Sequence, residues 1–174
     1  MARKLKILVT GAFNAGKSAF VRTACDGATV HTERAVTGDQ QATKTRTTVA
    51  LDFGQLLSPR GNQLLLFGTP GQERFAPMRQ VLARGTAGGV LVVDCADRTT
   101  LGEAQEFARW LRDSPWPLVV AANKQDQPNA VPAAELRALL GLPSTVGLVA
   151  CCALKRAAVL AVLDELEAAI ARGI

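Results

Sequence analysis

Apolar runs alternate with amphipathic stretches along this chain, and short polar loops separate them. An unbroken apolar run of about four to eight residues favours a buried strand, whereas apolar positions three and four apart favour a helix. Strands are predicted at 5–10, 48–53, 63–67, 88–94, 117–122 and 146–150. Helices are predicted at 18–25, at 99–113, after Pro132, and on the stripe of Val159, Val162, Leu163, Leu166 and Ile170.

The order of these elements predicts an α/β fold. Strands alternating with helices form a mostly parallel sheet covered on both faces, here a three-layer sandwich with six strands. Turn chemistry at 58–62 indicates that 48–53 and 63–67 form one antiparallel hairpin. Residues 28–47 are polar and without a period, which is typical of a long functional loop.

A glycine-rich motif follows the first strand. Residues 11–18 fit the pattern G-x-x-x-x-G-K-[ST] at every fixed position, which makes a chance turn a poor explanation. Backbone N–H groups of such a loop, and the start of the next helix, suit phosphate oxygens. Lys17 is predicted to reach the β- and γ-phosphates, and the Ser18 hydroxyl to bind Mg²⁺. The motif predicts a P-loop NTPase.

A second motif, Asn123-Lys124-Gln125-Asp126, follows the strand at 117–122. The Asp126 carboxylate can accept hydrogen bonds from guanine N1–H and the exocyclic amine, and adenine offers neither donor in that arrangement. The Lys124 stem can lie over the base, and Asn123 can connect this loop to the phosphate loop. N-K-x-D alone could be a surface turn, but beyond a phosphate loop in the same sheet it favours guanine.

Composition limits the other possibilities. A chain of 174 residues predicts one domain spanning 1–174. The net charge of +5 is scattered, so no nucleic-acid partner is expected. No apolar run approaches the roughly 20 residues of a membrane span. Together with Ala at position 2 and no cysteine near the end, this predicts a cytoplasmic protein with no direct membrane anchor.

The cysteines lie in apolar stretches without metal-ligand spacing. They are interpreted as small buried hydrophobic residues of a reducing compartment, although the neighbours Cys151 and Cys152 leave redox sensitivity open. The set is Cys25, Cys95, Cys151 and Cys152.

In its motifs the chain resembles the Ras-like small GTPases over essentially its whole length. The matches are 11–18, Thr48 before a strand, T-P-G-Q-E-R-F at 69–75, N-K-Q-D at 123–126, and Cys152-Ala153-Leu154. Within that family, the F-G-T-P-G-Q stretch looks most like bacterial gliding-motility and conservon GTPases, which are encoded beside roadblock-type regulators.

The resemblance implies a G domain that binds GTP or GDP with Mg²⁺ and signals to a regulator and an effector. It implies switch regions at about 30–48 and 68–84. Thr48 would close on Mg²⁺ and the γ-phosphate, the Gly71 N–H would sense that phosphate, and the Ala153 backbone would meet the guanine oxygen. The implied nucleotide-binding residues are Phe13, Asn14, Ala15, Gly16, Lys17, Ser18, Ala19, Gly71, Asn123, Lys124, Asp126, Cys152, Ala153 and Leu154.

Two positions depart from the family pattern. Gly68 stands where most members have an aspartate that holds Mg²⁺ through water, which predicts weaker Mg²⁺ retention and easier GDP release. Phe13 replaces a usual glycine and would obstruct an activator's arginine, a contribution of roughly 10³–10⁵ in rate. Gln72 is retained and could orient the attacking water, so Gln72, Lys17 and Thr48 are the predicted catalytic residues.

The expected function is therefore a GTP/GDP switch with slow intrinsic hydrolysis, accelerated by a partner that reshapes the switches. Two alternatives stay open. One is a nucleotide-locked scaffold with negligible turnover, and the other is a P-loop ATPase or small-molecule kinase, which Asp126 disfavours.

Overall fold

The computed structural model describes residues 2–26, 29–35, 48–70 and 81–173. The strands are β1 (Lys4–Thr10), β2 (Thr29–Ala35), β3 (Thr48–Leu57), β4 (Gln63–Gly68), β5 (Gly88–Asp94), β6 (Leu118–Asn123) and β7 (Gly147–Ala150). The helices are α1 (Lys17–Ala24), α3 (Leu101–Arg112), α4 (Ala133–Leu139) and α5 (Arg156–Arg172), with a short 3₁₀ turn, η2 (Arg98–Thr100), before α3.

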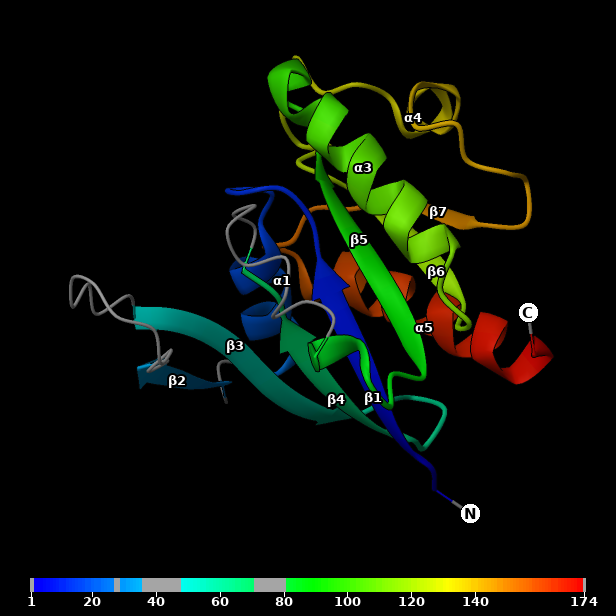
Figure 1. The fold of residues 1–174 in the computed structure, drawn as a ribbon. Coiled ribbons are helices and arrows are strands. Elements are labelled where there is room, and N and C mark those ends of the chain that lie inside the picture. The colour runs from blue at the N-terminus through cyan, green and yellow to red at the C-terminus, as the bar shows by residue number, and fades with distance from the viewer. Residues whose placement is uncertain (1, 27–28, 36–47, 71–80, 174) are drawn as a thin grey trace, which may run out of the picture.

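The strands form one sheet in the order β2-β3-β4-β1-β5-β6-β7 (Figure 1). β3 runs antiparallel to both of its neighbours, and β4, β1, β5, β6 and β7 are parallel to one another. The predicted α/β class, with its mostly parallel sheet and its hairpin at 48–67, is confirmed.

The sheet has seven strands within the described residues, one more than the six predicted. The additional strand is β2, in a segment that we expected to be loop, where Thr29 to Ala35 pair with Gly54 to Thr48 of β3. An edge strand is held by backbone hydrogen bonds to one neighbour and needs no apolar alternation. The hydrophobic pattern therefore gave no signal for β2.

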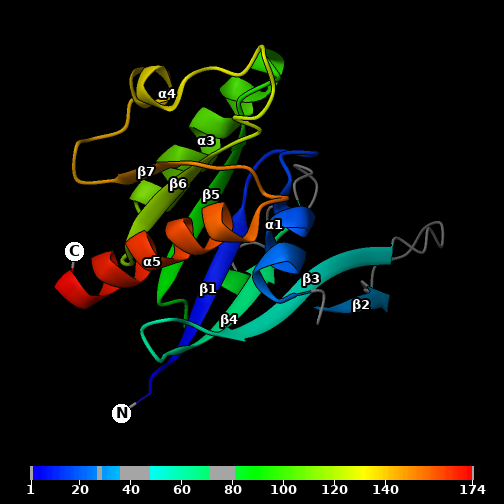
Figure 2. The same cartoon turned by 180° about the vertical axis from the view of Figure 1, so that it is seen from behind.

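Helices cover both faces of the sheet. α1 and α5 lie on one face, and α3 and α4 lie on the other (Figures 1 and 2). The predicted stripe of α5 is confirmed: Val159, Val162, Leu163 and Leu166 are buried, and Ile170 packs against the same cluster. The second cluster includes Ala104, Phe107, Ala108 and Leu111 of α3.

The central strands explain where the site forms. Every residue of β5 and β6 is buried, as expected of parallel strands covered on both faces. Their last residues, Asp94 and Asn123, are buried polar groups, and so are Thr10 at the end of β1 and Thr69 just after β4. Polar side chains therefore gather where the parallel strands end, which is where open α/β sheets bind ligands.

A different polar contact holds the opposite end of the sheet. Glu167 of α5 is buried, and its Oε1 accepts hydrogen bonds from Ser58 Oγ (2.9 Å) and Asn62 Nδ2 (2.8 Å). Next to it, Arg60 donates to Asp164 in a largely exposed ion pair. The turn between β3 and β4 is thereby fixed to α5.

The cysteines are free and buried, as predicted. Burial raises the pKa of Cys25 and of Cys95 to about 11, and that of Cys151 to about 12. These three thiols are therefore protonated at neutral pH and poor nucleophiles. Among the described helices, none has the length and apolarity to cross a membrane.

Candidate nucleotide-binding site

The phosphate loop connects β1 to α1, and its two fixed glycines are required by its geometry. Gly11 has φ 145°, and a Cβ there would lie 2.2 Å from the Val92 carbonyl oxygen. Gly16 has φ 102°, and a Cβ there would lie 2.3 Å from Asn123 Nδ2. Any side chain at either position would collide with a neighbouring strand or loop, so the loop can take this path only with glycine.

The side chain of Lys17 lies where the phosphate loop leads into α1. Lys17 is the first residue of α1, and its Nζ donates to the carbonyl oxygens of Gly11 (2.9 Å) and Ala12 (2.6 Å). The ammonium group is therefore held over the loop, beside the N-terminus of α1, where partial positive charge favours anions. Phe13 projects from the same loop with 66% of its surface exposed.

A cavity of about 530 Å³ opens beside the loop. Its volume lies in the range of small-molecule sites, roughly 300–1,000 Å³. It brings together predicted residues from three separate segments of the chain: Asn14, Gly16, Ala19, Asn123, Lys124, Asp126, Cys152, Ala153 and Leu154. Phe13, Ala15, Lys17 and Ser18 are not among its lining residues. The lining also includes Ala96, Gln127 and Asn129, which the sequence did not single out.

Asn123 connects the three segments. It is buried, its Nδ2 donates to the Ala15 carbonyl (2.9 Å), and its Oδ1 accepts from the Ala153 N–H (2.8 Å). The expected connection from Asn123 to the phosphate loop is thus present. The second bond joins the Ala153 backbone, which the resemblance places at the guanine oxygen, to the side chain of Asn123.

Lys124 is fixed by a partner that the sequence analysis missed. Its backbone has φ 63°, and its Nζ pairs with Asp94 Oδ2 at 2.5 Å. Asp94 is buried and also accepts from the Ala96 N–H (2.9 Å), so its charge is well compensated. Because β5 and β6 are parallel neighbours, an aspartate ending β5 could have been matched to Lys124 just after β6.

Asp126 lines the cavity and is exposed. The pKa of this carboxyl is lowered, first by its own backbone N–H and then by the Cys152 side chain. Gln127 and the charge of Lys155 act in the same direction, while desolvation opposes them. The group is therefore anionic at neutral pH and can act only as an acceptor.

The remaining predicted site residues do not line the cavity or lie outside the described residues. Ser18 Oγ donates a hydrogen bond to Asp52 Oδ2 on β3. Thr48 is the first residue of β3, where it is paired with Ala35. Gly71 and Gln72 lie outside the described residues, as does most of the predicted switch at 68–84.

Hydroxyl and carboxylate oxygens such as those of Ser18 and Asp52 are the hard donors that Mg²⁺ prefers, so these residues fit that ion. No group of three or more histidine, cysteine or acidic residues suited to a metal occurs in the described parts of the chain.

The sheet order, the glycine-rich loop between β1 and α1 and the adjoining N-K-Q-D cavity define the P-loop G-domain class of fold. The profile of the ADP-ribosylation factor family matches residues 1–170, and the chain belongs to that family. This finding supports the resemblance to Ras-like small GTPases.

Two relatives are ADP-ribosylation factor-like protein 4D from Bos taurus and from Homo sapiens. Each is 40% identical to this chain over 87 residues, which is 48% of this chain. The aligned part covers 44% of the bovine protein and 43% of the human protein. The chain thus spans less than half the length of the curated relatives that it matches.

Proposed function

We propose that this protein binds GTP and GDP with Mg²⁺ and acts as a guanine-nucleotide switch. The observation that carries the proposal is the Asp126 carboxylate at a cavity whose wall is connected by Asn123 to the phosphate loop. One ligand, with its guanine at Asp126 and its phosphates over residues 11–18, would occupy both the cavity and the phosphate loop. Family membership supports the same function.

Different side chains would bind different parts of the nucleotide. Lys17 would exchange its contacts with the loop carbonyls for phosphate oxygens, and the Lys124 stem, held by Asp94, would lie against the base. Ser18 would hold Mg²⁺, which supplies positive charge to offset the charge of the phosphate chain. Thr48 and the Gly71 N–H would respond to the third phosphate, and residues 30–48 and 68–84 would carry that difference to a partner.

Hydrolysis is proposed to be slow. Phosphoryl transfer depends on positioning and charge stabilisation, and here Gln72 would orient the attacking water while Lys17 and Mg²⁺ offset charge. The exposed Phe13 ring stands on the loop that an activator's arginine would have to approach. We therefore propose that a regulator of roadblock type accelerates the reaction by reshaping the switches, and that an effector reads the triphosphate form in the cytoplasm.

Single-turnover GTP hydrolysis tests this proposal. Wild type should turn over slowly, Phe13→Gly should be faster, and Gln72→Ala should be slower. Phe13→Leu, which keeps an apolar side chain of similar bulk, is the matched control and should resemble wild type. Fast unaided hydrolysis by wild type, above the rate of Phe13→Gly, would overturn the slow-switch proposal. Tight GTP binding with no hydrolysis in any variant would indicate a nucleotide-locked scaffold.

A further inference from the structure

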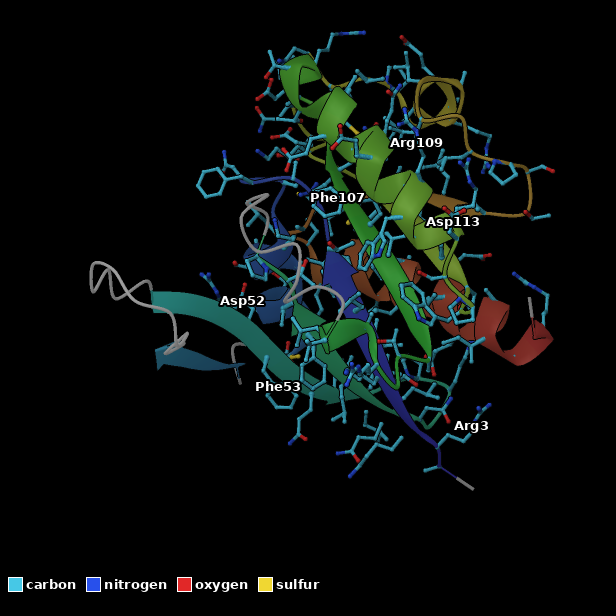
Figure 3. All side chains as sticks on the ribbon, viewed as in Figure 1. Arg3, Asp52, Phe53, Phe107, Arg109 and Asp113 are labelled. Carbon is cyan, nitrogen blue, oxygen red and sulfur yellow. The ribbon has the colours of Figure 1, made fainter. Side chains whose placement is uncertain are left out.

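An acidic residue of β3 lies against the hydroxyl of the phosphate loop. Asp52 Oδ2 accepts a hydrogen bond from Ser18 Oγ at the start of α1. The next residue on the same face of β3, Gly54, also adjoins α1: a Cβ there would lie 2.5 Å from Cys25 Sγ and 3.2 Å from Val21 Cγ1. Helix α1 therefore packs along this face of β3 and holds Ser18 beside Asp52 (Figure 3 labels Asp52).

The same carboxylate lies directly opposite Gly68. β3 and β4 are antiparallel, and Phe53 pairs with Phe67, with their rings 4.9 Å apart. One step further along this ladder Asp52 faces Gly68. A Cβ on Gly68 would lie 3.0 Å from Asp52 Cβ and 3.4 Å from Asp52 Oδ2. A side chain at position 68 would therefore crowd that of Asp52, which would have to shift by a few tenths of an ångström.

We propose that Asp52 supplies, from β3, the Mg²⁺-site carboxylate that the family pattern places at position 68. This inference rests on the proposed binding of Mg²⁺ and guanine nucleotide. Mg²⁺ usually keeps several waters and takes few protein ligands, so a carboxylate that accepts hydrogen bonds from those waters adds to retention of the ion. Glycine at position 68 avoids this crowding of the Asp52 side chain, which reaches Ser18.

This assignment changes the expectation drawn from Gly68 alone. A missing carboxylate would predict weak Mg²⁺ retention and easy GDP release. With Asp52 in that place, wild type should retain GDP in Mg²⁺ and release it quickly when the ion is chelated.

The test measures how free Mg²⁺ slows the dissociation of a fluorescent GDP analogue. Asp52→Asn keeps the shape and can still accept from Ser18, but it loses the charge. Loss of a carboxylate beside a metal typically lowers affinity about 10- to 100-fold, so the Mg²⁺ midpoint should rise by that factor. Asp113→Asn is the matched control: Asp113 is exposed at the C-terminal end of α3, away from Asp52 (Figure 3).

Exchanging the two residues, in Asp52→Gly/Gly68→Asp, moves the carboxylate to the other strand and removes the close Cβ contact. This variant should recover much of the Mg²⁺ dependence that Asp52→Gly alone loses, and thermal unfolding of each variant would report folding separately.

An Asp52→Asn variant with the wild-type Mg²⁺ midpoint would overturn the inference, because Asp52 would then be only a structural partner of Ser18. Failure of the exchange to recover any dependence would also contradict it. If wild type binds no guanine nucleotide at all, the proposed function itself fails, which is a distinguishable result.

Discussion

The two sides of the candidate site are built differently. On the base side, Asn123 and Asp94 are buried and their hydrogen bonds join strand ends and loops of the protein to one another. On the metal side, Ser18 is exposed, Asp52 is half-buried, and one hydrogen bond joins them. We infer that base selection is built into the fold, whereas the metal side uses side chains that can exchange protein contacts for ligand contacts. Changes on the two sides should therefore have separable effects.

The largest effect is expected on the base side, from Asp126→Ala. Two hydrogen bonds from guanine to a carboxylate would be lost, so GDP affinity should fall roughly 100-fold or more. Inosine diphosphate, which lacks the exocyclic amine, should bind more weakly than GDP to wild type but about equally to the variant. Calorimetric titration of both nucleotides measures this difference. Asp113→Ala, which changes an exposed aspartate at the C-terminal end of α3, is the control, and equal losses in both variants would count against the assignment.

A second base-side change tests whether the connection through Asn123 matters. Asn123→Ala would leave the Ala15 carbonyl and the Ala153 N–H without this partner, at a cost of about 1–3 kcal/mol for each buried group. Both the unfolding temperature and GDP affinity should fall. Asn129→Ala removes an exposed amide of the same cavity and should change stability little. Similar unfolding temperatures for the two variants would show that the base side is less rigidly connected than we infer.

A change outside both sides should affect stability alone. Glu167→Ala would leave Ser58 and Asn62 without their acceptor, which should cost about 1–3 kcal/mol of unfolding free energy. The discrimination of GDP from inosine diphosphate and the Mg²⁺ midpoint should both stay as in wild type. Chemical denaturation and the two binding assays would show this, with Glu106→Gln on the exposed face of α3 as the control. Altered discrimination between GDP and inosine diphosphate would contradict the expectation that Glu167 affects stability alone.

The smallest effect is expected at the Arg60–Asp164 pair. The hydrogen bond that Arg60 donates to Asp164 lowers the pKa of the Asp164 carboxyl below its ordinary value. The pair therefore stabilises the fold above the unfolded-state pKa, and this stabilisation is lost as the pH falls through the lower folded-state pKa. Both partners are about half exposed, so solvent screening keeps the contribution small. Asp164→Asn should slightly reduce the acid dependence of the unfolding temperature and leave nucleotide release unchanged; a large change at neutral pH would contradict this.

The predictable parts of the fold were those with a strong local pattern. The run at 88–94 gave the bounds of β5, and the spacing of Val159, Val162 and Leu166 identified the buried stripe of α5. β2 was missed because an edge strand is fixed by pairing with β3 and not by its own apolar period.

The phosphate loop and the N-K-Q-D segment could be identified from the sequence, because each is a recognisable run of residue types directly after a predicted strand. Asp94 and Asp52 were missed for a common reason: each acts on a side chain from another element, Lys124 and Ser18 respectively. Such pairs depend on strand order and register, which no single stretch of sequence specifies. The use of the Ala153 N–H by Asn123 is a similar tertiary detail.

We propose that one pocket selects guanine at Asp126 and holds a phosphate chain over residues 11–18. The most direct measurement is to denature the purified protein and to identify the nucleotide it releases, including its number of phosphates. We expect GDP or GTP. Release of an adenine nucleotide in its place would show that the pocket does not select guanine.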